Sequence, residues 1–135
     1  MARRSRAREV ALQVLYRDDL NPTDEPYDAG EFLQGRLGRD ELVEFAQSLV
    51  AGVRRNRQEL DGLLERFAEN WTLSRMAVTD RNVLRIGAFE ILHSSTPPRV
   101  AINEAVELAK RFGSRQSAQF VNGILDKLLQ KHRNG

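Results

Sequence analysis

Arginines concentrate in two short segments of the chain, and their guanidinium groups are well suited to binding phosphate. The first eight residues hold four arginines and no acidic residue before Glu9: Arg3, Arg4, Arg6 and Arg8. A second basic segment holds Lys110, Arg111 and Arg115. The planar guanidinium fork can donate two parallel N–H bonds to one phosphate, which lysine cannot do. The pattern favours nucleic-acid binding, with a merely solvated basic surface as the alternative.

Three aromatic residues could take part in recognition or in packing. By spacing, Phe120 belongs to an apolar helical stripe, yet it directly follows the second basic segment, where an aromatic ring can stack on an unpaired base. The spacing favours the core interpretation, and a dual role is also open. Tyr16, at the end of the first helix, is either a core residue or an anchor for a protein partner. Trp71, between two helices, is predicted to be a packing residue.

Residue types that support catalysis or metal binding are scarce. The chain has no cysteine, which excludes disulfides, thiolate nucleophiles and sulfur-ligated zinc. It has two histidines, His93 and His132, and no P-loop, GxGxxG, GxSxG or HExxH motif. Glu104 and Glu107 are three residues apart on one helix, which is typical of a solvated acidic face. The sequence therefore predicts a protein that is not an enzyme and uses no metal, cofactor or small-molecule substrate.

Composition indicates one folded domain. The chain has 135 residues, 41% of them hydrophobic and 30% charged, and a formal net charge of only +2. No apolar run approaches the ~20 residues that a membrane-spanning helix needs. The first residues carry no hydrophobic segment of a secretory signal. A cytoplasmic protein with no membrane partner is the expectation.

Apolar residues recur at three- and four-residue steps along most of the chain, which predicts helices. Asn21 and Pro22 end the first helix, and residues 21–30 are predicted to be a polar loop. Four later breaks separate the remaining stripes: near Asn56, at 70–72, at 94–98 and at Gly113. Gly87 lies inside a helical stripe, where close approach of another helix would explain it. Since no segment alternates with period two, we predict an all-α bundle of six or seven helices.

Several blocks together resemble the NusB family of bacterial transcription antitermination factors. They cover nearly the whole chain and are weakest between about Asn21 and Asp40. The matching blocks are Arg6–Glu9 with Ala11–Gln13 and Leu15–Tyr16, Asp80–Arg81 with Leu84–Arg85 and Glu90, Val100–Lys110, and Phe120–Asp126. The Ala-Ile-Asn-Glu-Ala and Phe-Val-Asn-Gly sequences, in this order, are highly specific to this family. They also occur in a NusB-like domain fused to some RNA cytosine methyltransferases.

The resemblance implies a single NusB-like RNA-binding domain over residues 1–135, built from two small helical subdomains. It implies binding, together with the ribosomal protein NusE, to single-stranded boxA RNA of nascent ribosomal RNA transcripts. The complex would join the RNA polymerase antitermination machinery and promote read-through. The alternatives are a helical protein–protein adaptor without RNA binding of its own, or a targeting subunit for RNA modification. A homodimer formed through the RNA-binding face is also open.

The resemblance also assigns residues to surfaces. The predicted RNA-binding residues are Arg3, Arg4, Arg6, Arg8, Arg111, Arg115, Gln116 and Phe120. The predicted NusE-binding residues are Tyr16, Asp80 and Arg81. The position of Gln116 is often acidic in relatives, and the neutral amide here should repel phosphate less. RNA binding without the partner is therefore expected to be stronger in this chain.

Overall fold

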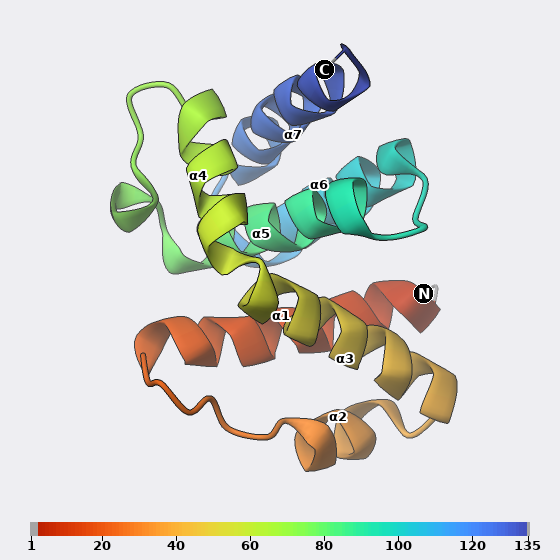
Figure 1. Cartoon of the computed structure of the whole chain (residues 1–135). Coiled ribbons are helices and arrows are strands. Elements are labelled where there is room, and N and C mark those ends of the chain that lie inside the picture. Colours follow the sequence, from red (N-terminus) through yellow and green to blue (C-terminus); the bar gives the residue numbers. More distant parts are fainter. Residues whose placement is uncertain (1–2, 135) are drawn as a thin grey trace.

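Helices form all the regular structure of residues 3–134, the part of the chain that this computed structural model describes (Figure 1). Seven α-helices and one 3₁₀ turn follow in order: α1 Arg3–Leu20, α2 Gly30–Leu37, α3 Asp40–Arg55, α4 Arg57–Phe67, η1 Leu73–Arg75, α5 Val78–His93, α6 Pro98–Phe112 and α7 Ser117–Asn134. Within these residues there is no strand. The predicted all-α fold with six or seven helices is confirmed.

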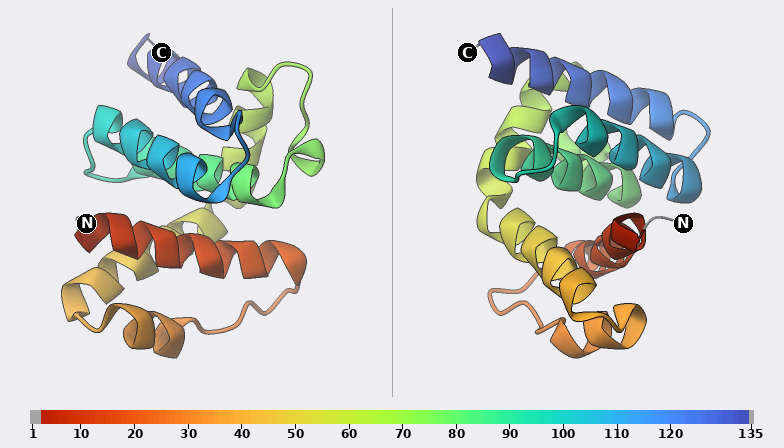
Figure 2. Two further views of the ribbon diagram at one scale, coloured as in Figure 1. Left: turned by 180° about the vertical axis from the view of Figure 1, so that it is seen from behind. Right: turned by 90° about the vertical axis from the view of Figure 1, so that its right-hand side faces the viewer.

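The helices form two lobes, as the resemblance implied. Helices α1, α2 and α3 pack on one another in the lower lobe of Figure 1, and α4 to α7 form the upper lobe. The lobes meet where α5 contacts both α1 and α3, and Figure 2 shows the same division from two other sides. One hydrophobic cluster runs through both lobes, so they share a core.

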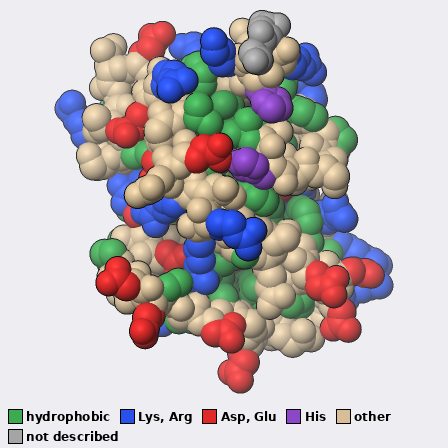
Figure 3. All heavy atoms as spheres, viewed as in Figure 1, with side chains coloured by type: hydrophobic (Ala, Val, Ile, Leu, Met, Phe, Trp, Pro, Cys, Tyr) green, Lys and Arg blue, Asp and Glu red, His purple; other side chains and the backbone are tan. Residues whose placement is uncertain are grey.

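Helix α1 is buried over most of its middle because it lies between the two lobes. Its predicted apolar stripe is fully buried, including Ala7, Val10 and Val14. The helix ends at Leu20, directly before Asn21 and Pro22, as the sequence predicts. The following segment, 21–29, is not helical and carries exposed acidic residues. Figure 3 shows acidic side chains gathered along the lower edge, on the lobe of α1 to α3.

Helix α5 is the centre of the upper lobe, and Gly87 permits its close packing. A Cβ atom at Gly87 would lie 2.6 Å from Leu125 Cδ1 on α7 and 3.3 Å from Ala105 Cβ on α6. The close approach predicted from this glycine is confirmed.

The connection from α6 to α7 also needs a glycine, Gly113, although not for the backbone conformation that usually favours glycine after a helix. A glycine after a helix typically adopts the left-handed conformation. Gly113 instead has extended dihedral angles, φ −97° and ψ −168°. A Cβ atom there would lie 2.5 Å from Ser117 Oγ and 2.8 Å from the Ala109 carbonyl oxygen. Space, and not a positive φ, requires glycine at this turn, which leads directly into the segment that contains Arg115 and Gln116.

Candidate nucleic-acid interface

The four N-terminal arginines do not share one environment. Arg3 and Arg4 are exposed at the start of α1, and Arg6 is partly exposed. The Arg4 guanidinium carbon lies 4.6 Å from the centre of the Phe45 ring on α3. Arg3, Arg4 and Arg6 can therefore present charge to a ligand.

Arg8 has to be removed from the predicted RNA-binding set, because only 4% of the residue is exposed. Its Nε and Nη2 donate to the two Glu90 carboxylate oxygens at 2.8 and 3.0 Å, and its Nη1 donates to Glu104 at 3.2 Å. A charge buried at this depth must be paired, so the guanidinium joins α1 to α5 and α6 and does not reach a phosphate. Glu104, predicted to be solvated, is one of its partners. The helical spacing of Arg8 with Ala11, Leu12 and Leu15 was the signal for burial.

Glu9 brings the two basic segments together. This buried carboxylate accepts from Arg6 Nη1 at 3.0 Å with one oxygen and is hydrogen-bonded to Arg111 Nη1 with the other. Arg6 belongs to α1 and Arg111 to the end of α6, so side chains about 100 residues apart in sequence share one carboxylate. About half of the Arg111 side chain is exposed (47%). The cleft between these helices also contains Ser5, Glu104 and Glu107.

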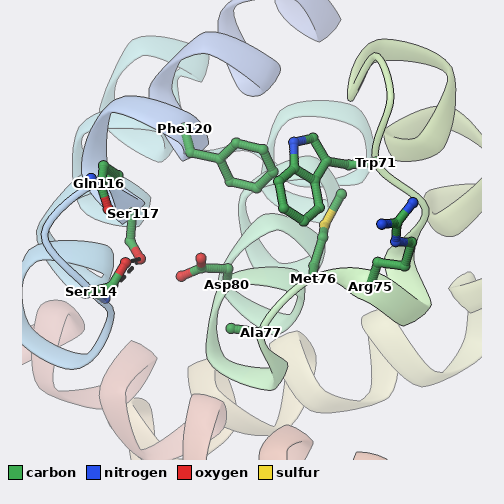
Figure 4. A pocket seen from close by; sticks show the side chains of 9 residues that line it. All are labelled: Trp71, Arg75, Met76, Ala77, Asp80, Ser114, Gln116, Ser117 and Phe120. Atoms are coloured by element: carbon green, nitrogen blue, oxygen red, sulfur yellow. Dashed lines mark hydrogen bonds between the residues drawn. The ribbon is translucent and has the colours of Figure 1, made fainter.

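A cavity of about 300 Å³ lies beyond the α6–α7 connection, and it contains two of the predicted RNA-binding residues, Gln116 and Phe120 (Figure 4). Phe120 is partly buried against the core, and its ring meets that of Trp71 edge to face, with centroids 6.1 Å apart. Trp71 is 48% exposed, so the prediction that it is a packing residue is wrong. It follows Glu69 and Asn70, whose positive φ angles of 23° and 63° turn the chain after α4.

The predicted Asp80–Arg81 pair points in two directions. Asp80 lines the cavity of Phe120 and Trp71, and its Oδ1 is buried without a hydrogen-bond partner among the described residues. Arg81 Nε instead donates to Asp19 at 2.6 Å, and its Nη1 donates to the Leu73 carbonyl oxygen at 3.1 Å. Because these bonds hold the Arg81 guanidinium inside the protein, its predicted role as a partner-facing residue needs correction.

Asp19 is the centre of a buried ion network between the two lobes. Besides Arg81, it accepts hydrogen bonds from Arg57 at 3.2 Å, Asn82 at 2.9 Å and Arg85 at 3.1 Å. Burial by itself would raise the pKa of Asp19. Hydrogen bonds from Arg81 and Asn82, together with the positive charges of Arg85 and Arg81, outweigh it and lower the pKa to about 2. The network fixes the start of α5, where Asp80 lies.

Tyr16 lies between the arginines and the aromatic cavity. It is 41% exposed and lines a second cleft, of about 280 Å³, with Gln13, Thr79 and Phe112. This cleft shares Glu9 with the cleft that Arg111 lines between α1 and α6, and it borders the aromatic cavity through Thr79, the neighbour of Asp80. The left view of Figure 2 shows this side of the molecule, with α1 below α6 and the α6–α7 connection. Arginines, Tyr16 and the aromatic cavity therefore follow one another along one face.

The remaining predicted features concern a histidine, membrane spans and metal ions. His93 ends α5, and its Nε2 lies 2.6 Å from Glu59 Oε1 on α4. No helix among the described residues is long and apolar enough to cross a membrane. No group of three or more His, Cys, Asp or Glu residues within 3–134 is arranged to hold a metal ion.

The described residues form a two-lobed, all-helical protein with exposed basic and aromatic side chains along one face. A model of the NusB family matches residues 5–130 of the chain. The transcription antitermination protein NusB of Anaeromyxobacter dehalogenans (strain 2CP-1) is 43% identical over 136 aligned residues, which cover 94% of this chain and 90% of that protein. The NusB protein of Saccharopolyspora erythraea is 46% identical, covering 95% and 87%. The chain belongs to the NusB family.

Solved structures agree with this family membership. The structure of T. maritima NusB matches with a TM-score of 0.84 and 36% identity, covering 97% of this chain and 92% of that one. A chain from a crystal structure of the antitermination factors NusB and NusE in complex with double-stranded RNA matches with a TM-score of 0.81 and 28% identity, covering 97% and 98%.

Proposed function

We propose that the protein is a non-enzymatic RNA-binding transcription antitermination factor. With ribosomal protein NusE it binds boxA RNA of nascent ribosomal RNA transcripts and promotes read-through by RNA polymerase. The domain that does so is the whole chain, residues 1–135. Its relatives carry the name of transcription antitermination protein, and a structural neighbour is bound to NusE and RNA.

The observation that carries the RNA-binding part is the junction at Glu9. Since Glu9 holds both Arg6 and Arg111, the two basic segments of the sequence meet at one carboxylate, where both arginine side chains stay partly exposed. Arg3, Arg4 and Arg115 are exposed and extend this basic surface on either side. Such a group of guanidinium groups contacts phosphates and positions a strand, while it carries little sequence information. Sequence must then be read elsewhere on the face, where Gln116 and Phe120 lie.

Tyr16 is the proposed centre of the NusE-binding surface. Its ring is exposed beside Phe112, another exposed aromatic side chain, and such rings are typical anchors of protein interfaces. Because this cleft adjoins both the cleft of Arg111 and the aromatic cavity, a bound NusE would lie next to the RNA. NusE would extend the RNA-binding surface, and the two ligands should bind cooperatively.

The test is a filter-binding titration with a boxA-like single strand and a scrambled strand of the same composition, each with and without NusE. We expect tighter binding of the boxA-like strand, and a further gain when NusE is present. NusE binding without any RNA binding would favour the adaptor alternative and overturn the proposal. Light scattering on the same samples shows whether a homodimer forms and whether RNA dissociates it.

A further inference from the structure

Two aromatic side chains from distant parts of the sequence line the cavity in Figure 4. Trp71 comes from the connection after α4, and Phe120 from the first turn of α7. Their rings are inclined by 72°, so a third flat ring can lie against the face of one and the edge of the other. A volume of about 300 Å³ lies at the small end of ligand cavities, which suits a single base.

The cavity also holds an acceptor without a donor. Asp80 Oδ1 is buried and receives no hydrogen bond from any described residue. The nearby hydroxyl groups of Ser114 and Ser117 lie 3.1 Å apart and bond to each other, and the Ser114 N–H donates to Ser117 Oγ. A buried oxygen left unpaired is costly, and a ligand that brings an N–H group relieves that cost. The exposed Arg75 lines the same cavity, and its guanidinium can donate to a phosphate group of the same ligand.

We propose that this cavity binds one unstacked base of the RNA and that Asp80 selects a base with an exocyclic amino group. The base stacks on Trp71 and Phe120, and its amino group donates to Asp80, as the N4 amino group of cytosine donates to carboxylates. Uracil has the carbonyl oxygen O4 where cytosine has the amino group, and its remaining donor, N3–H, lies between two oxygens that repel the carboxylate. This inference assigns Asp80 to RNA recognition. This inference rests on the proposed function, because it assumes that RNA binds.

Trp71 makes the inference directly measurable, because it is the only tryptophan of the chain. The probes are two RNA 12-mers, oligocytidylate and oligouridylate, titrated into the chain alone and into its complex with NusE. Filter binding reports total binding, and tryptophan fluorescence reports occupation of the cavity. The Trp71→Phe variant keeps an aromatic ring but has no tryptophan. Its complex with NusE therefore shows how much of the fluorescence comes from NusE. We expect quenching by oligocytidylate and about tenfold tighter binding than for oligouridylate, as for one hydrogen bond to a charged group.

Asp80→Asn tests selection, because the amide can donate to a uracil carbonyl and keeps the size of the side chain. We expect this variant to lose the preference for oligocytidylate while it quenches with both RNAs. Asp24→Asn removes the same charge from the exposed loop before α2 and should keep the preference. A preference that survives Asp80→Asn, or is absent from the unmodified protein, would overturn the role of Asp80.

The same experiment distinguishes a wrong inference about the cavity from a wrong proposed function. If RNA is retained on the filter but Trp71 fluorescence does not change, RNA binds elsewhere and the cavity takes no base. If neither 12-mer nor the boxA-like strand binds, with or without NusE, then RNA binding itself is wrong and the inference falls with it.

Discussion

Arginines of this chain form two groups whose side chains are identical but whose surroundings differ. Arg8 and Arg85 lie inside the protein, and each meets carboxylates from two other helices. Arg3, Arg4 and Arg6 lie only a few residues from Arg8, yet they reach solvent at the start of α1. Proximity in sequence does not decide whether an arginine is structural or available to a ligand.

Burial and the geometry of its partners decide whether an arginine is structural or available to a ligand. Arg85 donates through Nε and Nη2 to both oxygens of Asp61, at 2.7 and 3.1 Å, and through Nη1 to Asp19. Such bidentate pairs offset the large cost of removing charges from water, and loss of one partner leaves the other charge unpaired. On the exposed face the same group keeps most of its hydration and can exchange it for a phosphate. The interior group should therefore control stability, and the exposed group should control RNA affinity.

The largest expected effect is that of Arg85→Ala. It removes the bidentate partner of Asp61 and one of the four donors to Asp19, and it should lower the free energy of unfolding by about 3 kcal/mol, because Arg57 still pairs with both carboxylates. Urea denaturation measures the change. Arg55→Ala, at an exposed arginine of α3, is the control and should change stability by no more than ~0.5 kcal/mol. Equal effects of the two substitutions would contradict the division into interior and exposed arginines.

Replacing Arg3, Arg4 and Arg6 together by alanine should change RNA affinity more than stability. Each lost phosphate contact lowers the slope of log affinity against log salt by ~0.7, so three lost contacts lower it by about 2. The free energy of unfolding should fall by less than in Arg85→Ala, because Arg111 still pairs with buried Glu9 when Arg6 is replaced. A matched variant with alanine at Arg36, Arg39 and Arg55 removes the same charge from exposed positions elsewhere. If the slope of log affinity against log salt falls equally in both triple variants, the N-terminal arginines contribute only net charge.

Acid should weaken the interior network as the pH falls from about 4 to about 2. The pKa of Asp19 is lowered from its ordinary 3.8 to about 2 in the folded protein. Its contribution to stability is therefore complete above about pH 4 and is lost as the pH falls towards 2. The effect should be smaller than that of Arg85→Ala, because the protonated side chain still accepts a bond from Asn82. Urea denaturation between pH 5 and 2 should show a shallower loss in Asp19→Asn than in the unmodified protein.

The smallest effect concerns Tyr16, which lies between the exposed arginines and the aromatic cavity. Tyr16→Ala should lower NusE affinity directly, and RNA affinity mainly when NusE is present. Coupling between two ligands is typically ~1–3 kcal/mol, and each must tighten the other by the same factor. Calorimetry over all four edges of the binding cycle measures it. RNA affinity that is equal with and without saturating NusE would disprove cooperation between the surfaces.

The sequence by itself determined the helices and their ends. Apolar spacing and the breaks at Pro22, Asn56 and Pro97 act locally, and the backbone follows them almost residue by residue. Gly87 likewise indicated a close helix contact, because glycine weakens a helix interior and is kept where a neighbouring helix needs the space. The two basic segments were also visible, because the charge of a side chain is known from its residue type alone.

Only the tertiary structure decided which of these charges are free to act. Arg8 meets Glu90 and Glu104, which are more than 80 residues away, and no local signal shows that pairing. Trp71 is exposed because of the turn that precedes it, and it then meets Phe120 from another helix. Asp80 and Arg81 are neighbours that face opposite ways. Pairing and burial depend on how distant helices pack, whereas helix formation depends on residues within a few turns of one another.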